Sequence, residues 1–255
     1  MVSTGRRITT AGLLLMVITA PAVKAALTTD SSAKVSGQHA DRMLGFSVAT
    51  PPENAVILFD GKGLRNWHYA GGEPALWKVA DGAMTIGRGN IVTGETFSDA
   101  FIHIEFMEPD MPRATGQAKG NSGIYIQGRY EIQVLDSYGL NIPGKGDCGA
   151  IYGQYAPLVN ACKPPLEWQT CDIVFRAPRV DNSGKVTEPG RMTVLQNGVV
   201  IHNNVELLGP TVGSLAGTVG EPGPLLLQDH GSPVQYRNIW LVRLPLKGSD
   251  AYEPR

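Results

Sequence analysis

The stretch GNSGIYIQGRYEIQVLDSYG, residues 120–139, alternates apolar and polar side chains on both sides of a glycine-containing centre. Successive side chains of a β-strand point to opposite faces of a sheet, so this period of two predicts a strand hairpin. One predicted face is aliphatic and suits a core: Ile124, Ile126, Ile132 and Val134. The opposite face is polar: Tyr125, Gln127, Glu131 and Gln133. It is either an ordinary solvated sheet face or part of a site for a polar substrate.

Short strand patterns recur along the 255-residue chain, and 31 glycines and 18 prolines favour turns over helices. Asp81-Gly82 and Asn197-Gly198 each predict a hairpin turn. No segment shows helical periodicity over more than two turns. Further strands are predicted at 56–59, 64–69, 76–87, 101–108, 150–155, 168–178, 191–207, 225–231 and 234–245. We expect one all-β domain over residues 54–247, a β-sandwich or barrel with two extensive antiparallel sheets.

The N-terminus reads as a secretory signal at residues 1–25, with Arg6 and Arg7 ahead of the apolar stretch 8–20. That stretch is too short for a comfortable membrane span, so we expect a periplasmic or secreted protein with no span in the mature chain. A flexible lead-in at 26–53 and a short tail at 248–255 would flank the domain. Loss of the signal removes three basic residues and no acidic one, which changes the net charge from −1 to −4. A negative chain argues against a nucleic-acid partner.

The chain has three cysteines, and export to an oxidising compartment permits a disulfide. Cys148 and Cys162 flank a predicted strand and loop, and we favour a disulfide between them. Cys171 lies inside a predicted strand and reads as a buried free thiol. The alternative is that all three thiols are free. No close Cys/His pair accompanies them, so a zinc site is not expected.

Other strands contribute polar side chains that we place near the hairpin's polar face. The alternation at 101–108 puts Glu105 beside His103, and that at 168–178 puts Asp172 beside Trp168. The last strands add a further set: Gln228, Asp229, His230 and Arg237. Carboxylates and amides bond sugar hydroxyls, and aromatic rings cover the apolar face of a sugar. Each residue alone has a structural explanation, but their convergence on one inferred face favours a carbohydrate site.

The segment EIQVLD, residues 131–136, invites comparison with the E-x-D-x-x-E motif of laminarinase-like retaining glycosidases. Those enzymes need two carboxyl groups about 5–5.5 Å apart. Here Gln133 takes the middle position, and the last residue is the shorter Asp136. Without a bulge, Glu131 and Asp136 also fall on opposite faces. A retaining glycosidase is therefore only an alternative.

Several long segments resemble, in order, the 3-keto-disaccharide hydrolase family, also described as a 3-keto-glucoside 1,2-lyase and 3-keto-2-hydroxy-glucal hydratase domain. They are LFDGKGLRNW (58–67), GNSGIYIQGRYEIQVLDSYG (120–139), CGAIYGQYAPLVNACKPPLEWQT (148–170), QNGVVIHNNV (196–205) and GPLLLQDHGSPVQYRNIW (223–240). The resemblance covers about residues 54–245. It implies a concanavalin-like jelly-roll sandwich that acts on sugars oxidised at carbon 3, and a functional link to a sugar 3-dehydrogenase that supplies the ketone.

The implied reaction is abstraction of the carbon-2 proton, elimination of the carbon-1 substituent and hydration of the product. It needs one base, an enediolate stabiliser and an acid for the leaving group. We assign the base to Glu131 or His230, with Asp229 orienting His230. Gln133, Arg129 or a bound divalent metal ion would stabilise the enediolate, although no ligand spacing declares a metal site. The other polar residues would hold substrate: Glu105, Tyr125, Gln127, Asp172, Gln228 and Arg237. A non-catalytic, lectin-like carbohydrate-binding module remains the second alternative.

Overall fold

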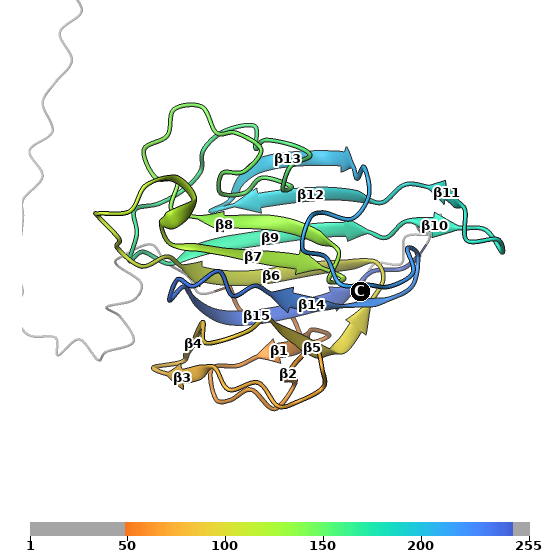
Figure 1. Ribbon diagram of the computed structural model, residues 1–255. Helices are drawn as coiled ribbons and strands as arrows, with labels where there is room; N and C mark the ends of the chain where they lie inside the picture. The colour runs from red at the N-terminus through yellow and green to blue at the C-terminus, as the bar shows by residue number, and fades with distance from the viewer. Residues whose placement is uncertain (1–48, 247–255) are drawn as a thin grey trace, which may run out of the picture. The chain divides into compact units, whose positions relative to one another are not determined.

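The computed structural model describes residues 49–246, and this part of the chain forms two antiparallel sheets that lie one over the other (Figure 1). The signal and tail predicted at 1–25 and 248–255 lie outside the described residues, as does most of the predicted lead-in. The only helical element within 49–246 is a 3-10 turn, Gly116–Ala118. The all-β sandwich prediction is confirmed.

The larger sheet has eight strands, in the order β13 (Val199–Glu206), β12 (Arg191–Gln196), β9 (Gln169–Arg176), β6 (Ala100–Met107), β15 (Gln235–Arg243), β4 (Ala83–Thr85) and β3 (Lys78–Ala80), with β1 (Val56–Phe59) also paired to β15. The smaller sheet has five, in the order β2 (Trp67–Tyr69), β5 (Ile91–Phe97), β14 (Gly223–Leu227), β7 (Asn121–Ile126) and β8 (Tyr130–Leu135). A two-stranded ribbon, β10 (Arg179–Val180) and β11 (Val186–Glu188), extends beyond them.

The hydrophobic core lies between the two sheets, because alternate residues of both turn inward. Ile102 and Ile173 of the large sheet and Ile124 and Val134 of the small sheet are fully buried in one cluster. Burying an aliphatic side chain of this size contributes about 1.5–3 kcal/mol, so the inward faces fix the register of each strand. The predicted inward faces at 101–108, 120–139 and 168–178 are confirmed.

Some predicted elements differ from the structure. Residues 150–155 do not form a strand: Ile151 makes only isolated bridges to Ile132 and Tyr155, and turns follow it. Strand β5 was not predicted, because its sequence IVTGETF has a glycine in its centre, and neither was the β10–β11 ribbon. β5 depends on partners that are distant in the sequence, β2 and β14, which local alternation does not reveal. The ribbon is a short local hairpin whose strands are mostly exposed, so it has no apolar alternation to detect.

The β7–β8 hairpin turns at Gln127 and Gly128, which have φ of 55° and 65°. Two left-handed residues in succession are typical of the type I′ turn, whose twist matches that of the strands. Gly128 is needed for a second reason, because a Cβ there would lie 2.7 Å from Leu215. The strand alternation therefore ends at Ile126, and Gln127 does not continue the outward face of Tyr125.

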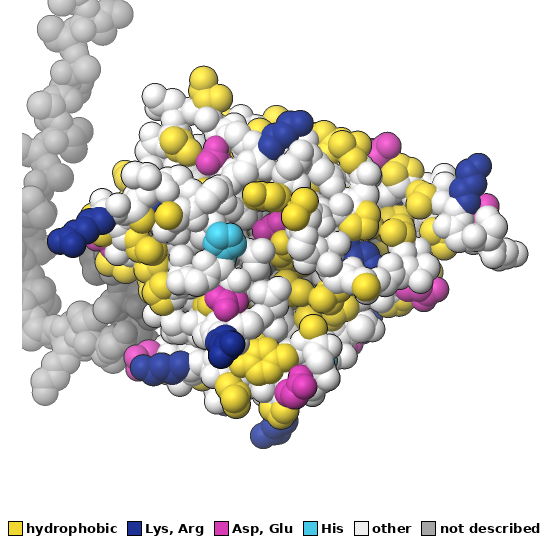
Figure 2. Space-filling model, viewed as in Figure 1, with side chains coloured by type: hydrophobic (Ala, Val, Ile, Leu, Met, Phe, Trp, Pro, Cys, Tyr) yellow, Lys and Arg dark blue, Asp and Glu magenta, His cyan; other side chains and the backbone are white. Residues whose placement is uncertain are grey.

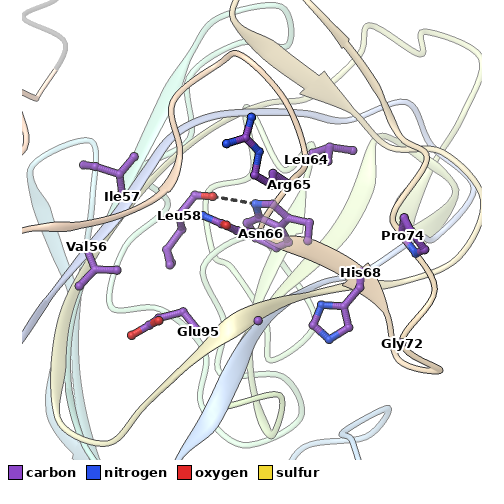
Figure 3. A pocket seen from close by; sticks show the side chains of 12 residues that line it. Val56, Ile57, Leu58, Leu64, Arg65, Asn66, His68, Gly72, Pro74 and Glu95 are labelled. Atoms are coloured by element: carbon purple, nitrogen blue, oxygen red, sulfur yellow. Dashed lines mark hydrogen bonds between the residues drawn. The ribbon is translucent and has the colours of Figure 1, made fainter.

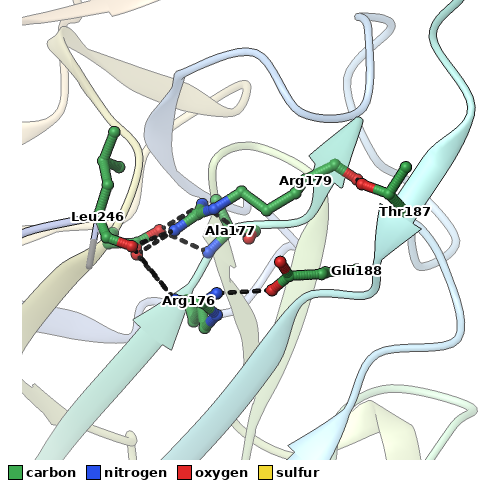
Figure 4. Close-up of polar contacts among 7 residues, drawn as sticks. Arg176, Ala177, Arg179, Thr187, Glu188 and Leu246 are labelled. Atoms are coloured by element: carbon green, nitrogen blue, oxygen red, sulfur yellow. Dashed lines mark hydrogen bonds and ion pairs between the residues drawn. The ribbon is translucent and has the colours of Figure 1, made fainter. Parts of the chain in front are cut away.

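A buried carboxylate anchors the far end of the large sheet. Asp99 accepts hydrogen bonds from Arg179 at 2.9 and 2.6 Å and from the Ala177 amide at 2.9 Å, and Arg176 pairs with Glu188 at 2.6 Å (Figure 4). Bidentate pairing of a guanidinium with a carboxylate is a strong, directional contact. It ties the β10–β11 ribbon to the body of the sandwich.

The topology separates residues that the sequence analysis placed on one surface. Strand β6, with Glu105, pairs with β9 and β15 in the large sheet, whereas β7 and β8 belong to the small sheet. The outward side chains of the two sheets lie on opposite outer surfaces of the sandwich. The expectation of one polar surface shared by Glu105 and Glu131 is wrong.

Candidate functional site

A cavity of about 160 Å³ lies on the outer face of the small sheet. Its buried floor consists of Asn121, Tyr125, Glu131 and Gln133, from β7 and β8. Its rim consists of Gln117, Tyr152, Val212, Gly213, Gln228 and His230. The face above β7, β8 and β14 is largely uncharged, with one histidine and a few acidic groups near its centre (Figure 2). Glu131 is the only carboxylate that lines the cavity, and no Lys or Arg lines it.

Loops make this face concave by covering the β7–β8 turn and the free edge of β8. At the turn, the Thr211 amide donates to the Arg129 carbonyl, and the Leu215 amide donates to the Gly128 carbonyl, both at 2.8 Å. At the free edge of β8, the Tyr152 amide donates to the Glu131 carbonyl at 3.1 Å. These contacts explain why every residue of β7 and β8 is buried although one face of the sheet points away from the core.

The Glu131 carboxylate occupies a space that Gly123 leaves open on the neighbouring strand. A Cβ at Gly123 would lie 2.4 Å from Glu131 Oε1 and 2.8 Å from the ring of Tyr125. The glycine therefore allows the carboxylate to lie flat on the sheet beneath the cavity.

The electrostatics of Glu131 are those of an uncompensated buried acid. Glu131 is 3% exposed. Burial raises the pKa of its carboxyl to about 7, although the contact with Tyr125 acts to lower that pKa. Within residues 49–246, no cation pairs with it. A carboxylate with a pKa close to neutrality can both take and release a proton under physiological conditions.

The Gln133 amide links Glu131 to the other side of the cavity. In one orientation its nitrogen donates to Gln117 Oε1 at 3.2 Å and Asn121 Oδ1 at 3.3 Å. With oxygen and nitrogen exchanged, the nitrogen donates to Glu131 Oε1 and the Ser122 carbonyl, both at 3.2 Å. The second orientation gives an ionised Glu131 a donor, so we favour it for that state.

Tyr125 is held from two directions. Its hydroxyl donates to the Val212 carbonyl at 2.9 Å and accepts from the Gln228 side chain at 3.2 Å. Burial, together with nearby Glu131, raises the pKa of this phenol, which stays a neutral hydroxyl. Gly213 has φ of 79°, and a Cβ there would lie 2.8 Å from the Tyr125 oxygen, so the loop closes tightly onto the ring.

His230 lies at the rim and is exposed, and its ring makes no hydrogen bond to any described residue. The sequence predicts that Asp229 orients the His230 imidazole, but the structure shows no hydrogen bond between these two side chains. Asp229 instead accepts from the amides of Gly89 and Gly231, both at 2.8 Å, and its own amide donates to Asn90. Asp229 therefore holds the loop that carries His230, rather than the imidazole itself.

Gln127 and Arg129 do not line the cavity, contrary to the sequence-based assignment. The Gln127 side chain donates to the Phe97 carbonyl at 2.8 Å and accepts from Arg129 at 3.2 Å. Arg129 also donates to the Glu221 carbonyl at 2.9 Å. The reason is the hairpin turn, which directs both side chains into the end of the sandwich, where they tie loops together.

Glu105, Asp172 and Arg237 gather on the opposite outer surface, around His103. Its Nδ1 lies 2.6 Å from Asp172 Oδ1, and Glu105 accepts from Arg237 Nε at 2.6 Å and from Asn238 at 2.8 Å. The His103 ring stacks on Trp240 at 5.0 Å, and the Arg237 guanidinium lies 4.0 Å above Trp168.

Charge pairing governs the pKa values of this second group. Burial opposes the charge of His103, but the adjacent Asp172 and Glu105 outweigh it and raise the pKa to about 9. Burial likewise opposes the charge of Glu105, but the charge of nearby His103 and hydrogen bonds from Asn238 and Arg237 lower its pKa to about 2. These groups are ionised and paired, which indicates a structural network.

The predicted pair of cysteines lies together inside the protein without a bond between the sulfurs. All three thiols are free in the structure, and Cys171 is buried as expected. The Gln196 amide nitrogen lies 3.5 Å from Cys148 Sγ and 3.4 Å from Cys162 Sγ. The disulfide stays a prediction.

No group of three or more His, Cys, Asp or Glu side chains suited to a metal ion occurs within residues 49–246. In the cavity, Glu131 and His230 are the only residues of these types. The donor set does not match a protein-held divalent ion, so no chemical step is assigned to one.

A larger cavity lies elsewhere in the described part of the chain. About 800 Å³ in volume, it lies between β1, the loop before β2 and the centre of β5 (Figure 3). Its wall includes Trp67, whose indole nitrogen donates to the Leu58 carbonyl at 2.8 Å, and the exposed side chains of Arg65 and Asn66. It shares no residue with the cavity at Glu131, and its lining holds no buried titratable side chain.

The 3-keto-alpha-glucoside-1,2-lyase-like domain family matches residues 54–242, which is most of the chain. The chain belongs to this family. The family match includes β7, β8, β14 and the loops that line the cavity at Glu131, and the resemblance drawn from the sequence is confirmed.

Solved structures of similar proteins agree with this family assignment. A "putative glycosyl hydrolase" from Parabacteroides distasonis ATCC 8503 is 35% identical, with a TM-score of 0.70, and the match covers 85% of this chain and 100% of that one. A second protein of the same description and organism is 21% identical with a TM-score of 0.54, over 76% and 95% of the two chains. A third is 23% identical with a TM-score of 0.52, over 74% and 99%. The last two show the shared fold. Among curated proteins, no sequence matches this chain.

Sequence reasoning missed five residues that line this cavity: Gln117, Asn121 and Tyr152, which have polar side chains, and Val212 and Gly213. Asn121 could have been found, because it lies four residues before Tyr125 on the same outward face. Gln117 and Tyr152 could not, since each comes from a loop whose position depends on contacts with β7 or β8.

Proposed function

We propose that this protein is a carbohydrate-active enzyme that cleaves 3-keto-glycosides by elimination and hydration, with Glu131 as the base. One observation carries the proposal: a single buried carboxyl with a pKa raised to about 7, in a cavity without a second carboxylate or a cation. A retaining glycosidase requires two carboxylates. Asp136, the other candidate, is instead paired with Lys119 at 2.8 Å.

The first step is proton transfer from carbon 2 of the sugar to Glu131. The ketone at carbon 3 acidifies this proton, because the electron pair left behind moves onto the ketone oxygen as an enediolate. A base with a pKa near the working pH is the most effective for such a transfer. The Gln228 side chain and the Tyr152 hydroxyl are the rim groups that can donate hydrogen bonds to the developing oxyanion.

The second step breaks the bond between carbon 1 and the glycosidic oxygen. The enediolate electrons form the double bond between carbons 1 and 2, and the departing oxygen takes a proton. His230 is the exposed rim group that we assign to supply it. Water then adds its hydroxyl to carbon 1 and passes its remaining proton to His230, while the protonated Glu131 gives a hydrogen to carbon 2. The sum is net hydrolysis, and both side chains return to their starting protonation states.

A 3-keto sugar is produced by oxidation of the corresponding hydroxyl. The substrate would therefore come from a sugar 3-dehydrogenase, and the predicted signal at 1–25 would place the present enzyme outside the cytoplasm. Within residues 49–246, no helix is long and apolar enough to cross a membrane.

The proposal is tested with a 3-keto-disaccharide and its unoxidised parent, with and without a chelator. We expect release of 3-keto-glucose from the oxidised sugar alone, and incorporation of deuterium at carbon 2 in deuterated water. The value of kcat/KM should rise about tenfold per pH unit below about 7 and level off above it, because Glu131 of the free enzyme must be ionised. Cleavage of the parent sugar would indicate an ordinary glycosidase, and binding without turnover a lectin-like module.

A further inference from the structure

A buried polar cluster includes two cysteines of the loop at 136–168, and it has no part in the proposed reaction. Glu108 is 1% exposed and accepts a hydrogen bond from the Gln169 side chain at 2.7 Å. Its other oxygen lies 4.0 Å from Cys148 Sγ, within reach of the thiol hydrogen. The Gln196 amide nitrogen contacts Cys148 Sγ, Cys162 Sγ and Gln169 Oε1. Two thiols and one carboxyl thus share a single hydrogen-bond network.

Cys148 belongs to the segment that continues to Tyr152 at the rim of the cavity. Next to Cys148, Gly149 and Ala150 exchange backbone hydrogen bonds with Gln133 at 2.8 and 2.9 Å. Two residues further on, Tyr152 is bonded to the Glu131 backbone and forms the rim. The loop from 136 to 168 contains no regular strand or helix within it, so its position depends on such contacts.

We propose that Cys148 and Cys162 are a thiol modification site: they form a disulfide, with Glu108 as the proton acceptor, and the bond fixes the Tyr152 loop against β8. The buried carboxyl supports this role, because burial raises the pKa of Glu108 well above its ordinary value and so makes it a stronger base when ionised. The neighbouring Cys162 and burial raise the pKa of the Cys148 thiol as well, so its ionisation requires a base in contact with it.

The oxidation balances with an external disulfide as the two-electron oxidant. The half-buried Cys162 thiolate attacks one sulfur of that disulfide and releases its other half as a thiolate. Cys148 then passes its proton to the Glu108 carboxylate and attacks Cys162 Sγ, and the second half leaves as a thiolate. The protein loses two hydrogens, and the oxidant becomes two thiols.

The test treats the signal-free chain with oxidised glutathione, blocks residual thiols by alkylation and measures the digest by mass spectrometry. We expect a disulfide-linked pair of peptides containing Cys148 and Cys162, with Cys171 alkylated. Closing a loop of this length should raise the Tm by roughly 5–10 °C. C171S is the matched control and should keep both effects, while C148S and C162S should lose both.

A second variant tests the carboxyl. E108Q keeps the shape of the side chain and its contact with Gln169. We expect the attack of Cys148 on Cys162 Sγ to be at least tenfold slower in E108Q than in the native protein at pH 7. Free Cys148 and Cys162 after oxidation, or an unchanged rate in E108Q, would overturn the respective part of the proposal. Mass and Tm need no substrate, so this inference does not depend on the proposed function.

Discussion

The two outer surfaces of the sandwich carry the same kind of sequence pattern and opposite electrostatics. On the small sheet, Glu131 is buried without a cation, and its pKa is raised to about 7. On the large sheet, Glu105 is buried to the same extent but contacts Arg237 and His103, and its pKa is lowered to about 2. Both residues are glutamates that alternate with apolar or aromatic neighbours in a strand. Their partners, and not their burial, decide their chemistry.

We infer that this difference separates a reactive group from a structural one. An unpaired buried carboxylate is costly to the fold, and carboxylates of this kind cluster at sites where a proton is moved. A paired one is fixed as an anion, because its protonation would leave the guanidinium and imidazolium without a counterion. Changing one glutamate at a time should therefore affect activity on one surface and stability on the other.

The largest effect is expected from E131Q. The amide has the shape of the acid but cannot accept the carbon-2 proton, so the turnover of a 3-keto-disaccharide should fall at least about 10³-fold. Steady-state kinetics and the rate of deuterium exchange at carbon 2 measure this loss. Circular dichroism should show an intact fold, and a rate within tenfold of the native one would reject Glu131 as the base.

The counterpart is E105Q, which should fold less stably and keep its turnover. Breaking a buried ion pair costs about 3 kcal/mol, measured by urea unfolding. The depressed pKa of Glu105 makes its contribution complete above about 4.5 and lost as the pH falls through about 2. The raised pKa of His103 makes its contribution complete below 6.5 and lost as the pH rises through about 9.

The stability difference between native protein and E105Q should accordingly be greatest between about pH 4.5 and 6.5. A difference that does not change with pH would show that the ion pairs do not cause it. Loss of turnover in stably folded E105Q would instead show that Glu105 takes part in the reaction.

The smallest of these effects is expected from G123A. The added methyl group would lie 2.4 Å from Glu131 Oε1, so the carboxylate must move away from its place beneath the cavity. We expect about a tenfold lower kcat with little change in KM, since misplacing a base by a fraction of an ångström weakens proton transfer. G63A is the matched control, because a Cβ there meets nothing within 4 Å. Equal activities of the two variants would show that the space left by Gly123 does not position the Glu131 carboxylate.

The sequence alone determined most of the strands and the inward faces of the longest ones. Alternation around Ile124 and Ile132, or around Ile102 and Ile173, is visible without any structure, because burial of one sheet face requires a period of two. The long family segments also identified the chain's relatives, and Glu131, Gln133 and Tyr125 were correctly placed on one face.

Tertiary structure decided which strands share a sheet, and hence which polar residues can meet a common ligand. Nothing local shows that β6 joins β9 and β15 rather than β7, since pairing depends on contacts between residues far apart in the chain. The turn at Gln127 and the loops that bring Tyr152 and Gln117 to the rim depend on the same long-range contacts. Alternation tells which way a side chain points within its own sheet, whereas the cavity around Glu131 exists only after the sheets and loops are assembled.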